Sequence, residues 1–183
     1  MRVVSGSARG AALVAPGGLQ TRPTADRAKE ALFSMLAADI AGCVFLDVFA
    51  GSGAIGIEAL SRGADHAVFV DSAADAIAAV MQNLSKTRLS AHAEVIRADA
   101  ASAIKQLAAK NAIFDITFLD PPYESGLAQS AAQALLDAGL IKANGLLVIE
   151  QGENEEPLTF GNAALLKRKR YGAAAISIYE VNA

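Results

Sequence analysis

The stretch that decides the fold is VFLDVFAGSGAIGIEAL, residues 44–60. It opens as an apolar run with β-branched and aromatic members, which is short for a helix and typical of a buried strand. One acid, Asp47, interrupts the run, and the turn at residues 51–53 is followed by apolar residues at helical spacing. A strand, a glycine turn and a helix in this order predict a cradle for a nucleotide-like ligand, because glycines let backbone N–H groups approach it.

The glycine pattern G-x-G-x-x-G at residues 51–56 also matches the dinucleotide fingerprint, which is a weak signal alone. In dehydrogenases this turn usually follows an uninterrupted apolar strand, whereas here Asp47 lies four residues before the first glycine. The pattern resembles motif I of class I S-adenosylmethionine-dependent methyltransferases. That resemblance implies that Asp47 lies near the methionine end of the cofactor. It also implies that the cofactor lies against Ala50, Gly51, Ser52 and Gly53. The alternative is a tight strand-to-helix turn capped by Asp47.

Two further predicted strands end in acids. Residues 67–71 end in Asp71, which lies 20 residues beyond Gly51, the spacing of the carboxylate that binds a ribose. An ionised carboxylate can accept hydrogen bonds from both ribose hydroxyls. Residues 93–99 end in Asp99, followed by Ala100. In class I methyltransferases an acid at this point commonly accepts a hydrogen bond from the adenine amine, and Asp99 as a helix cap is the competing interpretation.

The strand predicted at 114–119 leads into the second strong signal, Asp120-Pro121-Pro122-Tyr123. Two consecutive prolines exclude a helix and remove two donors, so the Asp120 carboxylate and the Pro121 carbonyl can face one opening. The tetrapeptide resembles the (Asn/Asp/Ser)-Pro-Pro-(Tyr/Phe) motif of methyltransferases that act on exocyclic or amide nitrogens. The resemblance makes these four residues the catalytic candidates, and a rigid loop after a buried strand is the alternative.

The order of the remaining segments predicts an α/β fold, a doubly wound, mostly parallel seven-stranded sheet whose last strand can enter antiparallel. We expect a single domain over 1–183, with an N-terminal hairpin and helix extension at 1–38 and a cofactor-binding, catalytic core at 39–183. Predicted helices are 24–36, 55–62, 73–86, 100–110 and 128–138, and the later strands are 146–150, 165–170 and 174–179. The four acids then meet at the carboxyl ends of the strands, where such sheets bind ligands.

Composition limits the remaining possibilities. Hydrophobic residues make up 53% of the chain and charged residues 19%, which excludes a disordered chain. No apolar run reaches membrane-spanning length, and the single cysteine, Cys43, excludes an internal disulfide, so we expect a soluble, cytoplasmic protein without membrane contact. Two isolated histidines, His66 and His92, lack the spacing of a metal site, and no metal is expected.

The net charge of −3 counts against a nucleic-acid partner, although the basic residues are clustered in two parts of the chain. Residues 1–30 carry five basic and two acidic side chains, a local charge of +3, and residues 167–170 form a second basic cluster. Local basic patches can engage phosphates even on an acidic protein, and an ordinary solvated surface is the alternative.

Five segments together resemble one family, the RsmD family of bacterial small-subunit ribosomal RNA (guanine-N2-)-methyltransferases. They are RVVSG (2–6), RPTADRAKEALF (22–33), residues 47–60, DPPY (120–123) and RYG (170–172), in one order over essentially the whole chain. The Arg-Pro-Thr block is the most discriminating, since the other motifs occur in many enzymes. Lys29 is a small departure, at a position where arginine is expected as often.

The resemblance implies S-adenosylmethionine as cofactor and the N2 amine of a guanine, nucleotide 966 of 16S rRNA, as target. Asp120 and the Pro121 carbonyl would orient the amine, and Tyr123 would stack on the flipped base. The proton acceptor is either Asp120 or water. The expected partner is 16S rRNA within the small ribosomal subunit or its assembly intermediate, bound by a monomer. Candidate RNA contacts are Arg2, Arg9, Arg22, Arg27 and Lys29.

Two other functions remain open. An adenine-N6 nucleic-acid methyltransferase would use the same chemistry, but it typically carries an added target-recognition region for which 183 residues leave little room. A non-catalytic, NAD-type nucleotide-binding module would use the Asp-Pro-Pro-Tyr segment as a structural turn.

Overall fold

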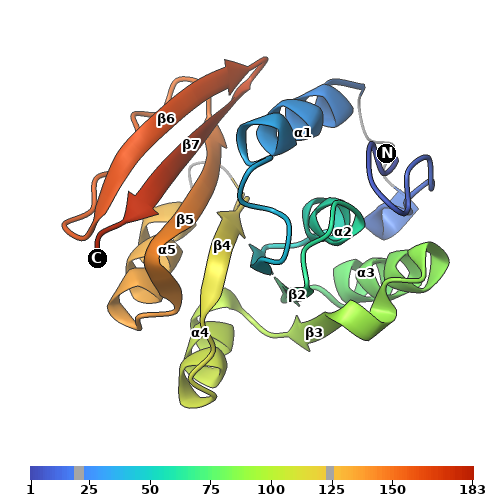
Figure 1. Ribbon diagram of the computed structural model, residues 1–183, viewed down its shortest axis with the longest axis horizontal. Helices are drawn as coiled ribbons and strands as arrows, with labels where there is room; N and C mark the ends of the chain where they lie inside the picture. Colours follow the sequence, from blue (N-terminus) through green and yellow to red (C-terminus); the bar gives the residue numbers. More distant parts are fainter. Residues whose placement is uncertain (19–22, 123–125) are drawn as a thin grey trace.

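Seven strands form one sheet in the order β3-β2-β1-β4-β5-β7-β6 in the computed structural model, which describes residues 1–18, 23–122 and 126–183 (Figure 1). Side chains are described over the same ranges except residues 18 and 23–27. The strands are β1 (Val44–Val48), β2 (His66–Asp71), β3 (Ala93–Arg97), β4 (Phe114–Leu119), β5 (Ile141–Gly152), β6 (Ala163–Tyr171) and β7 (Ala174–Val181). The first five are parallel, and β7 enters antiparallel between β5 and β6. The predicted fold class is confirmed.

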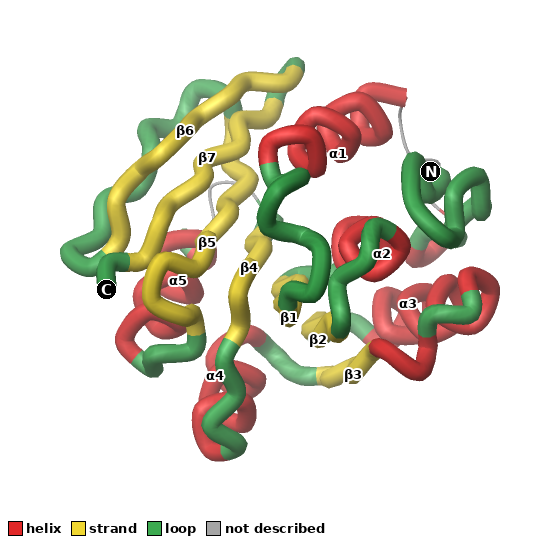
Figure 2. Tube along the Cα trace, viewed as in Figure 1, coloured by secondary structure: helices red, strands yellow, loops and turns green. Residues whose placement is uncertain are grey.

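Helices cover both faces of this sheet (Figure 2). The helices α1 (Pro23–Met35), α2 (Ala54–Ser61) and α3 (Ala74–Thr87) bury Leu32, Phe33, Ile57 and Val80 in one core. On the opposite face, α4 (Ala100–Ala109) and α5 (Leu127–Asp137) bury Ile104, Leu107 and Leu135 in a second core. Short 3₁₀ turns occur at Pro16–Gly18 and Ser90–His92. This three-layer arrangement leaves the carboxyl ends of the parallel strands as the edge where connecting loops meet.

Most element bounds agree with the expected ones, and the exceptions have local causes. Helix α2 begins at Ala54, one residue before the helical spacing that starts at Ile55, because Gly53 in the left-handed conformation starts it directly after the turn. Strand β3 ends at Arg97, since Asp99 serves as the N-cap of α4. Strand β5 starts earlier than expected, at Ile141, and its register shifts relative to β4 near Asn144, where φ is +62°.

The N-terminal segment folds back on itself as the sequence predicts, although its pairing is short. Arg2 and Ala12 form an isolated bridge. Backbone hydrogen bonds join Val3 to Ala11 and Gly10 at 2.9 Å and Leu13 to Met1 at 3.0 Å. The loop between the two arms rests on α2, where the Ser61 hydroxyl donates to the Ser5 carbonyl at 2.6 Å. The segment is therefore held both by its own pairing and by the core. No helix in the described part of the chain is long and apolar enough to cross a membrane.

Candidate functional site

Three adjoining hollows follow the carboxyl edge of the sheet. The first, about 260 Å³, is mostly apolar and lies between Asp71 and α4, with Ile104 among its lining residues. The second, about 250 Å³, lies between α1 and the ends of β1, β4 and β5. The third, about 490 Å³, joins them and is lined by Asp71, Asp120 and the two prolines. Phe49 lines all three, so they form one continuous cleft.

The glycine turn forms the floor of the cleft, and its glycines serve different purposes. Gly51 has a φ of +55°, and a Cβ built on it would meet only open space, so the backbone there faces the cleft directly. A Cβ on Gly56 would lie 2.3 Å from Cε1 of Phe69, which means that this glycine allows α2 to pack closely on β2. The same turn thus exposes its backbone on one side and packs tightly on the other.

Asp47 is buried below this turn, with a relative exposure of 1%. Its Oδ2 accepts a hydrogen bond from the Gly56 amide at 2.9 Å, so the capping interpretation is confirmed. Burial, with the nearby charge of Asp71 adding to it, raises the pKa of Asp47 to about 7 against the effect of the Gly56 hydrogen bond. Asp47 also lines the second hollow, and its contact with a cofactor stays a prediction.

Asp71 and Asp99 flank the first hollow, and both make backbone contacts. Asp71 accepts from the Gly51 amide at 2.8 Å and from the Ala73 amide at 2.9 Å, which fixes the turn while leaving carboxylate lone pairs for a ligand. Asp99 is exposed and caps α4 by accepting from the Ser102 amide at 2.9 Å. The hydrogen bonds from Ser102 lower the pKa of Asp99. The cap is therefore confirmed for Asp99, and the roles toward ribose and adenine stay predictions.

Asp120 lies where β4 ends, and Glu150 lies beside it. Leu119 pairs with Ile149 in the parallel register, so the next residue of each strand occupies neighbouring positions. Both acids line the second hollow together with Asp47. Burial, then the like charges of Glu150 and Asp47, raise the pKa of Asp120. Asp120 as a whole is exposed to the open cleft, although many protein atoms surround its carboxyl group. Tyr123 lies outside the described residues.

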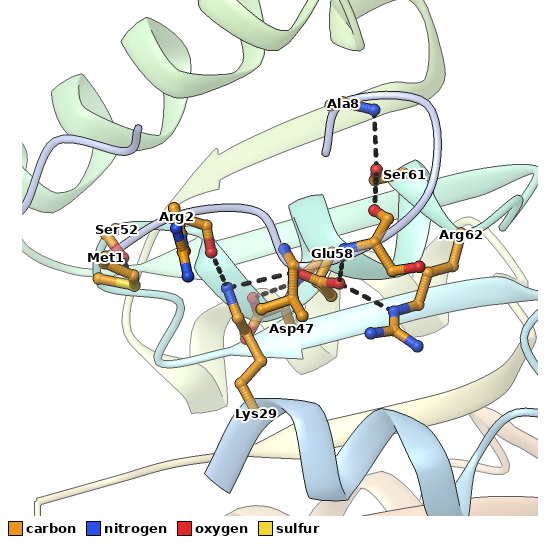
Figure 3. Close-up of polar contacts among 12 residues, drawn as sticks. Met1, Arg2, Ala8, Lys29, Asp47, Ser52, Glu58, Ser61 and Arg62 are labelled. Carbon is orange, nitrogen blue, oxygen red and sulfur yellow. Dashed lines mark hydrogen bonds and ion pairs between the residues drawn. The ribbon is translucent and has the colours of Figure 1, made fainter. Parts of the chain in front are cut away.

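Lys29 is not on the surface, which corrects its assignment as an RNA contact (Figure 3). It is 4% exposed, its Nζ lies 3.3 Å from Oε2 of Glu58, and it donates to the Arg2 carbonyl at 2.5 Å. Glu58 is fully buried and also accepts from the amides of Val4 and Ser5 and from Nε of Arg62, at 2.8, 2.9 and 2.9 Å. The lysine thus neutralises a buried carboxylate, and it also borders the second hollow.

The other predicted RNA contacts divide between described and undescribed residues. Arg2 and Arg9 are exposed on the N-terminal loop, and their contact with RNA stays a prediction. Arg22 lies outside the described residues, and of Arg27 only the backbone, within α1, is described. Within the ranges that the structure describes, no group of three potential ligands is placed to hold a metal ion.

A family model described as Conserved hypothetical protein 95 matches residues 1–180. The chain belongs to this family. Two proteins named Ribosomal RNA small subunit methyltransferase D, from Haemophilus influenzae and Escherichia coli, are each 35% identical over 181 residues. This alignment covers 98% of our chain and 93% and 89% of theirs. YlbH of Bacillus subtilis is 40% identical over 98% of both chains. The resemblance to the RsmD family is therefore confirmed.

Solved structures give the same result for the family fold. The E. coli protein yhhF superposes with a TM-score of 0.88 at 34% identity, covering 100% of this chain and 98% of that chain. The H. influenzae protein HI0767 superposes with a TM-score of 0.83 at 34% identity, covering 100% and 99%. The fold of the family is thus conserved over the full chain, including the N-terminal segment and the β6–β7 hairpin.

Sequence reasoning missed four residues that shape the site of this family member. Glu150 ends a strand in an acid as Asp71 does, so the same signal could have found it. Glu58 is an acid in an otherwise apolar stretch. Asn83 lies on the apolar face of α3 and donates from Nδ2 to the carbonyls of Ser52 and Val14, at 2.9 and 2.8 Å. Phe49, with a φ of +66°, carries no sequence signal.

Proposed function

We propose that this protein transfers a methyl group from S-adenosylmethionine to the exocyclic N2 amine of a guanine in small-subunit ribosomal RNA. The names of its relatives support the class of reaction and of RNA. The cleft supports S-adenosylmethionine as the cofactor. The hollow at one end is mostly apolar, which suits adenine, and the hollow at the other end is more polar, which suits the methionine part. The choice of guanine is supported by the pair Asp120 and Glu150, and the resemblance to the RsmD family indicates nucleotide 966.

The cofactor fits the residues present. Asp71 would accept from the ribose hydroxyls, and the apolar hollow between it and α4 would hold the adenine. The exposed backbone at Gly51 would allow close approach of the methionine part, with Asp47 beneath it. When bound, S-adenosylmethionine supplies a methyl group on a positively charged sulfur, which is already a strong electrophile. The protein therefore mainly has to position an amine.

The two neighbouring acids favour guanine over adenine. Ionised carboxylates only accept hydrogen bonds. The pairing edge of guanine presents two adjacent donors, N1–H and the N2 amine, whereas that of adenine presents the N6 amine beside an acceptor, N1. Asp120 and Glu150 occupy adjacent positions at the ends of β4 and β5 and line one hollow. The two adjacent donors of guanine would satisfy both carboxylates, while the adenine N1 would face a negative charge. This adjacency is the observation that carries the proposal.

The same acids would assist the chemistry. The lone pair of the guanine N2 is delocalised into the ring, which makes the amine a poor nucleophile. Hydrogen bonds from its N–H groups to Asp120 and to the Pro121 carbonyl would orient it and stabilise the positive charge that develops on nitrogen. Since the pKa of Asp120 is raised, its carboxylate is a better proton acceptor than a free aspartate.

Transfer of labelled methyl to small-subunit particles that lack this modification tests the proposal. Wild type, Asp120→Ala and the control Asp137→Ala, an exposed acid on α5, would be compared, followed by nucleoside analysis of the product. We expect N2-methylguanosine from wild type and the control, and a rate lower by a factor of about 10² to 10³ for Asp120→Ala. N6-methyladenosine would overturn the target. An absence of both transfer and S-adenosylmethionine binding would overturn the enzyme assignment.

A further inference from the structure

The basic cluster at residues 167–170 lies on β6, the edge strand of the sheet, and the structure divides it between the two faces. Arg168 pairs with Ser177 and Arg170 with Ala175, and the guanidinium of Arg168 is held by the carbonyl of Glu155 on the face covered by α4 and α5. Lys167 pairs with Ile178 and Lys169 with Ile176, both members of the opposite core. Both lysines are exposed. The two lysines therefore share the face on which the second hollow opens, the one lined by Asp47, Asp120 and Glu150.

One row of the sheet connects this edge to the hollow. Across it, Glu150 pairs with Ile176, and Ile176 pairs with Lys169. Directly opposed residues of an antiparallel pair point to the same face. Glu150 and Ile176 both line the second hollow, so Lys169 lies one strand beyond its wall. Neighbouring strands are about 4.8 Å apart, which puts the Lys169 backbone about 10 Å from that of Glu150. Figure 1 shows the β6–β7 turn at the same end of the sheet as the end of β4.

The charges along this row change sign. The hollow is lined by three acids, Asp47, Asp120 and Glu150, and by one lysine, Lys29, whose charge is paired with Glu58. The acids would repel the phosphates of any nucleotide whose base enters the hollow. A chain with a net charge of −3 offers no general attraction for RNA, so the phosphates need a local cationic surface. Lys167 and Lys169 provide two exposed ammonium groups next to the acidic hollow. The arrangement suits a flipped nucleotide, with its base in the hollow and its backbone along the edge.

We propose that Lys167 and Lys169 bind phosphate groups of the RNA strand on either side of the target nucleotide, so that the edge strand β6 is part of the RNA-binding surface. This inference rests on the proposed function. The competing explanation is that the lysines only protect an exposed sheet edge from pairing with other chains, as edge lysines commonly do. Leu165 and Leu166 on the same strand are 44% and 56% accessible, so this edge carries exposed apolar side chains that could need such protection.

The test compares wild type with Lys167→Gln/Lys169→Gln and with a control, Lys86→Gln/Lys105→Gln, which removes two exposed lysines from α3 and α4. Affinity for small-subunit particles and for protein-free small-subunit rRNA would be measured from low to high salt, together with S-adenosylhomocysteine affinity. For the β6 variant we expect RNA affinity to fall about 5- to 10-fold. We also expect the slope of log affinity against log salt to decrease by about 0.7–0.9 per lysine. Methylation should show a raised KM for RNA with an unchanged kcat.

The outcomes separate this inference from the function on which it rests. If wild type neither binds nor methylates particles, the proposed function fails. If wild type is active and the β6 variant keeps its affinity and salt slope, the RNA role of the lysines is overturned. Self-association of the β6 variant with unchanged RNA binding would establish edge protection instead. A loss seen with particles but not with protein-free rRNA would indicate a ribosomal protein as the partner and also overturn the inference.

Discussion

Three carboxylates line the second hollow, and each has a distinct environment. Asp47 is buried under the glycine turn, Asp120 faces the open cleft, and Glu150 lies next to Asp120 across one strand pair. Burial is the main reason why the pKa values of Asp47 and Asp120 are raised, and neighbouring like charges add to it. A ligand that presents adjacent donors relieves this repulsion. This supports the proposal that the hollow takes a base edge with two adjacent N–H donors.

Replacing Glu150 by glutamine should alter base selection more than the fold. The target guanine would be exchanged for 2-aminopurine, which keeps the N2 amine but has an acceptor at N1, in small-subunit particles reconstituted with either base. For Glu150→Gln we expect kcat/KM on guanine to fall about 10- to 100-fold and that on 2-aminopurine to change little, because the amide can donate to N1. Equal losses on both bases would show a structural role only. Glu156→Gln, an exposed acid in the following loop, is the control.

How far single residues could be predicted depended on whether their partners are local. Asp71 and Asp120 follow strands that periodicity identifies, so their meeting at one sheet edge could be predicted. Lys29 was assigned wrongly because charge alone indicates a surface, whereas its partner Glu58 lies on another helix, brought close only by tertiary packing. The position of Phe49 in all three hollows depends on a backbone conformation, φ +66°, that no residue pattern announces.

At the scale of elements, α2 joins the cofactor turn to the N-terminal extension. Its N-terminus begins at Gly53, and its Glu58 binds the N-terminal loop through two amides and α1 through Lys29 (Figure 3). On α3, Asn83 links the carbonyl of Ser52 to both backbone groups of Val14. The predicted RNA-binding extension and the glycine turn therefore share buried polar partners. Local patterns predicted the helices, but these links depend on contacts between distant segments.

Glu58→Gln should destabilise the protein strongly, because Lys29 would lose its buried counter-charge. The new amide NH2 would also face a backbone donor, that of Val4 or that of Ser5, since these two amides donate to different oxygens of Glu58. We expect a loss of about 3 kcal/mol in the free energy of unfolding, which corresponds to a Tm lower by roughly 6–12 °C. The control is Glu94→Gln, which breaks the exposed ion pair with Lys110 and should cost less than about 1 kcal/mol. Thermal unfolding of both variants is the measurement. If both variants lowered Tm by similarly small amounts, the stabilising role of Glu58 would be contradicted.

For the whole molecule, one buried acid gives the stability a pH dependence. The pKa of Asp47 is about 7 in the folded protein and close to 3.9 in an unfolded chain. The folded state therefore holds a proton that the unfolded state has released between these values. Stability of the cofactor-free protein should fall as pH rises from about 4 to 7, and the full penalty is present above pH 7. A buried carboxylate that lowers stability is typical of a functional site, where a charged group is kept although it destabilises the folded protein.

Asp47→Asn should remove the part of this dependence that comes from Asp47, since the amide oxygen can still accept from Gly56 without a buried charge. The raised pKa of Asp120 should leave a trend of the same sign. We expect the variant to exceed wild type in free energy of unfolding at pH 8 by on the order of 3 kcal/mol, with the difference vanishing near pH 4. Urea unfolding at several pH values measures this. Asp39→Asn, an exposed acid, should show no such trend. A difference between Asp47→Asn and wild type that stays constant with pH would refute the assignment.

The insertion of β7 between β5 and β6 has a consequence for synthesis of the chain. Strand β6 pairs only with β7, so it has no place in the sheet until residues 174–181 have left the ribosome. Until then β5 presents an open, hydrogen-bonding edge, the kind of surface that other chains can capture. The sheet closes only after β7 has been made, so a chain released before residue 174 would be recognisable to chaperones and proteases by its unpaired edge.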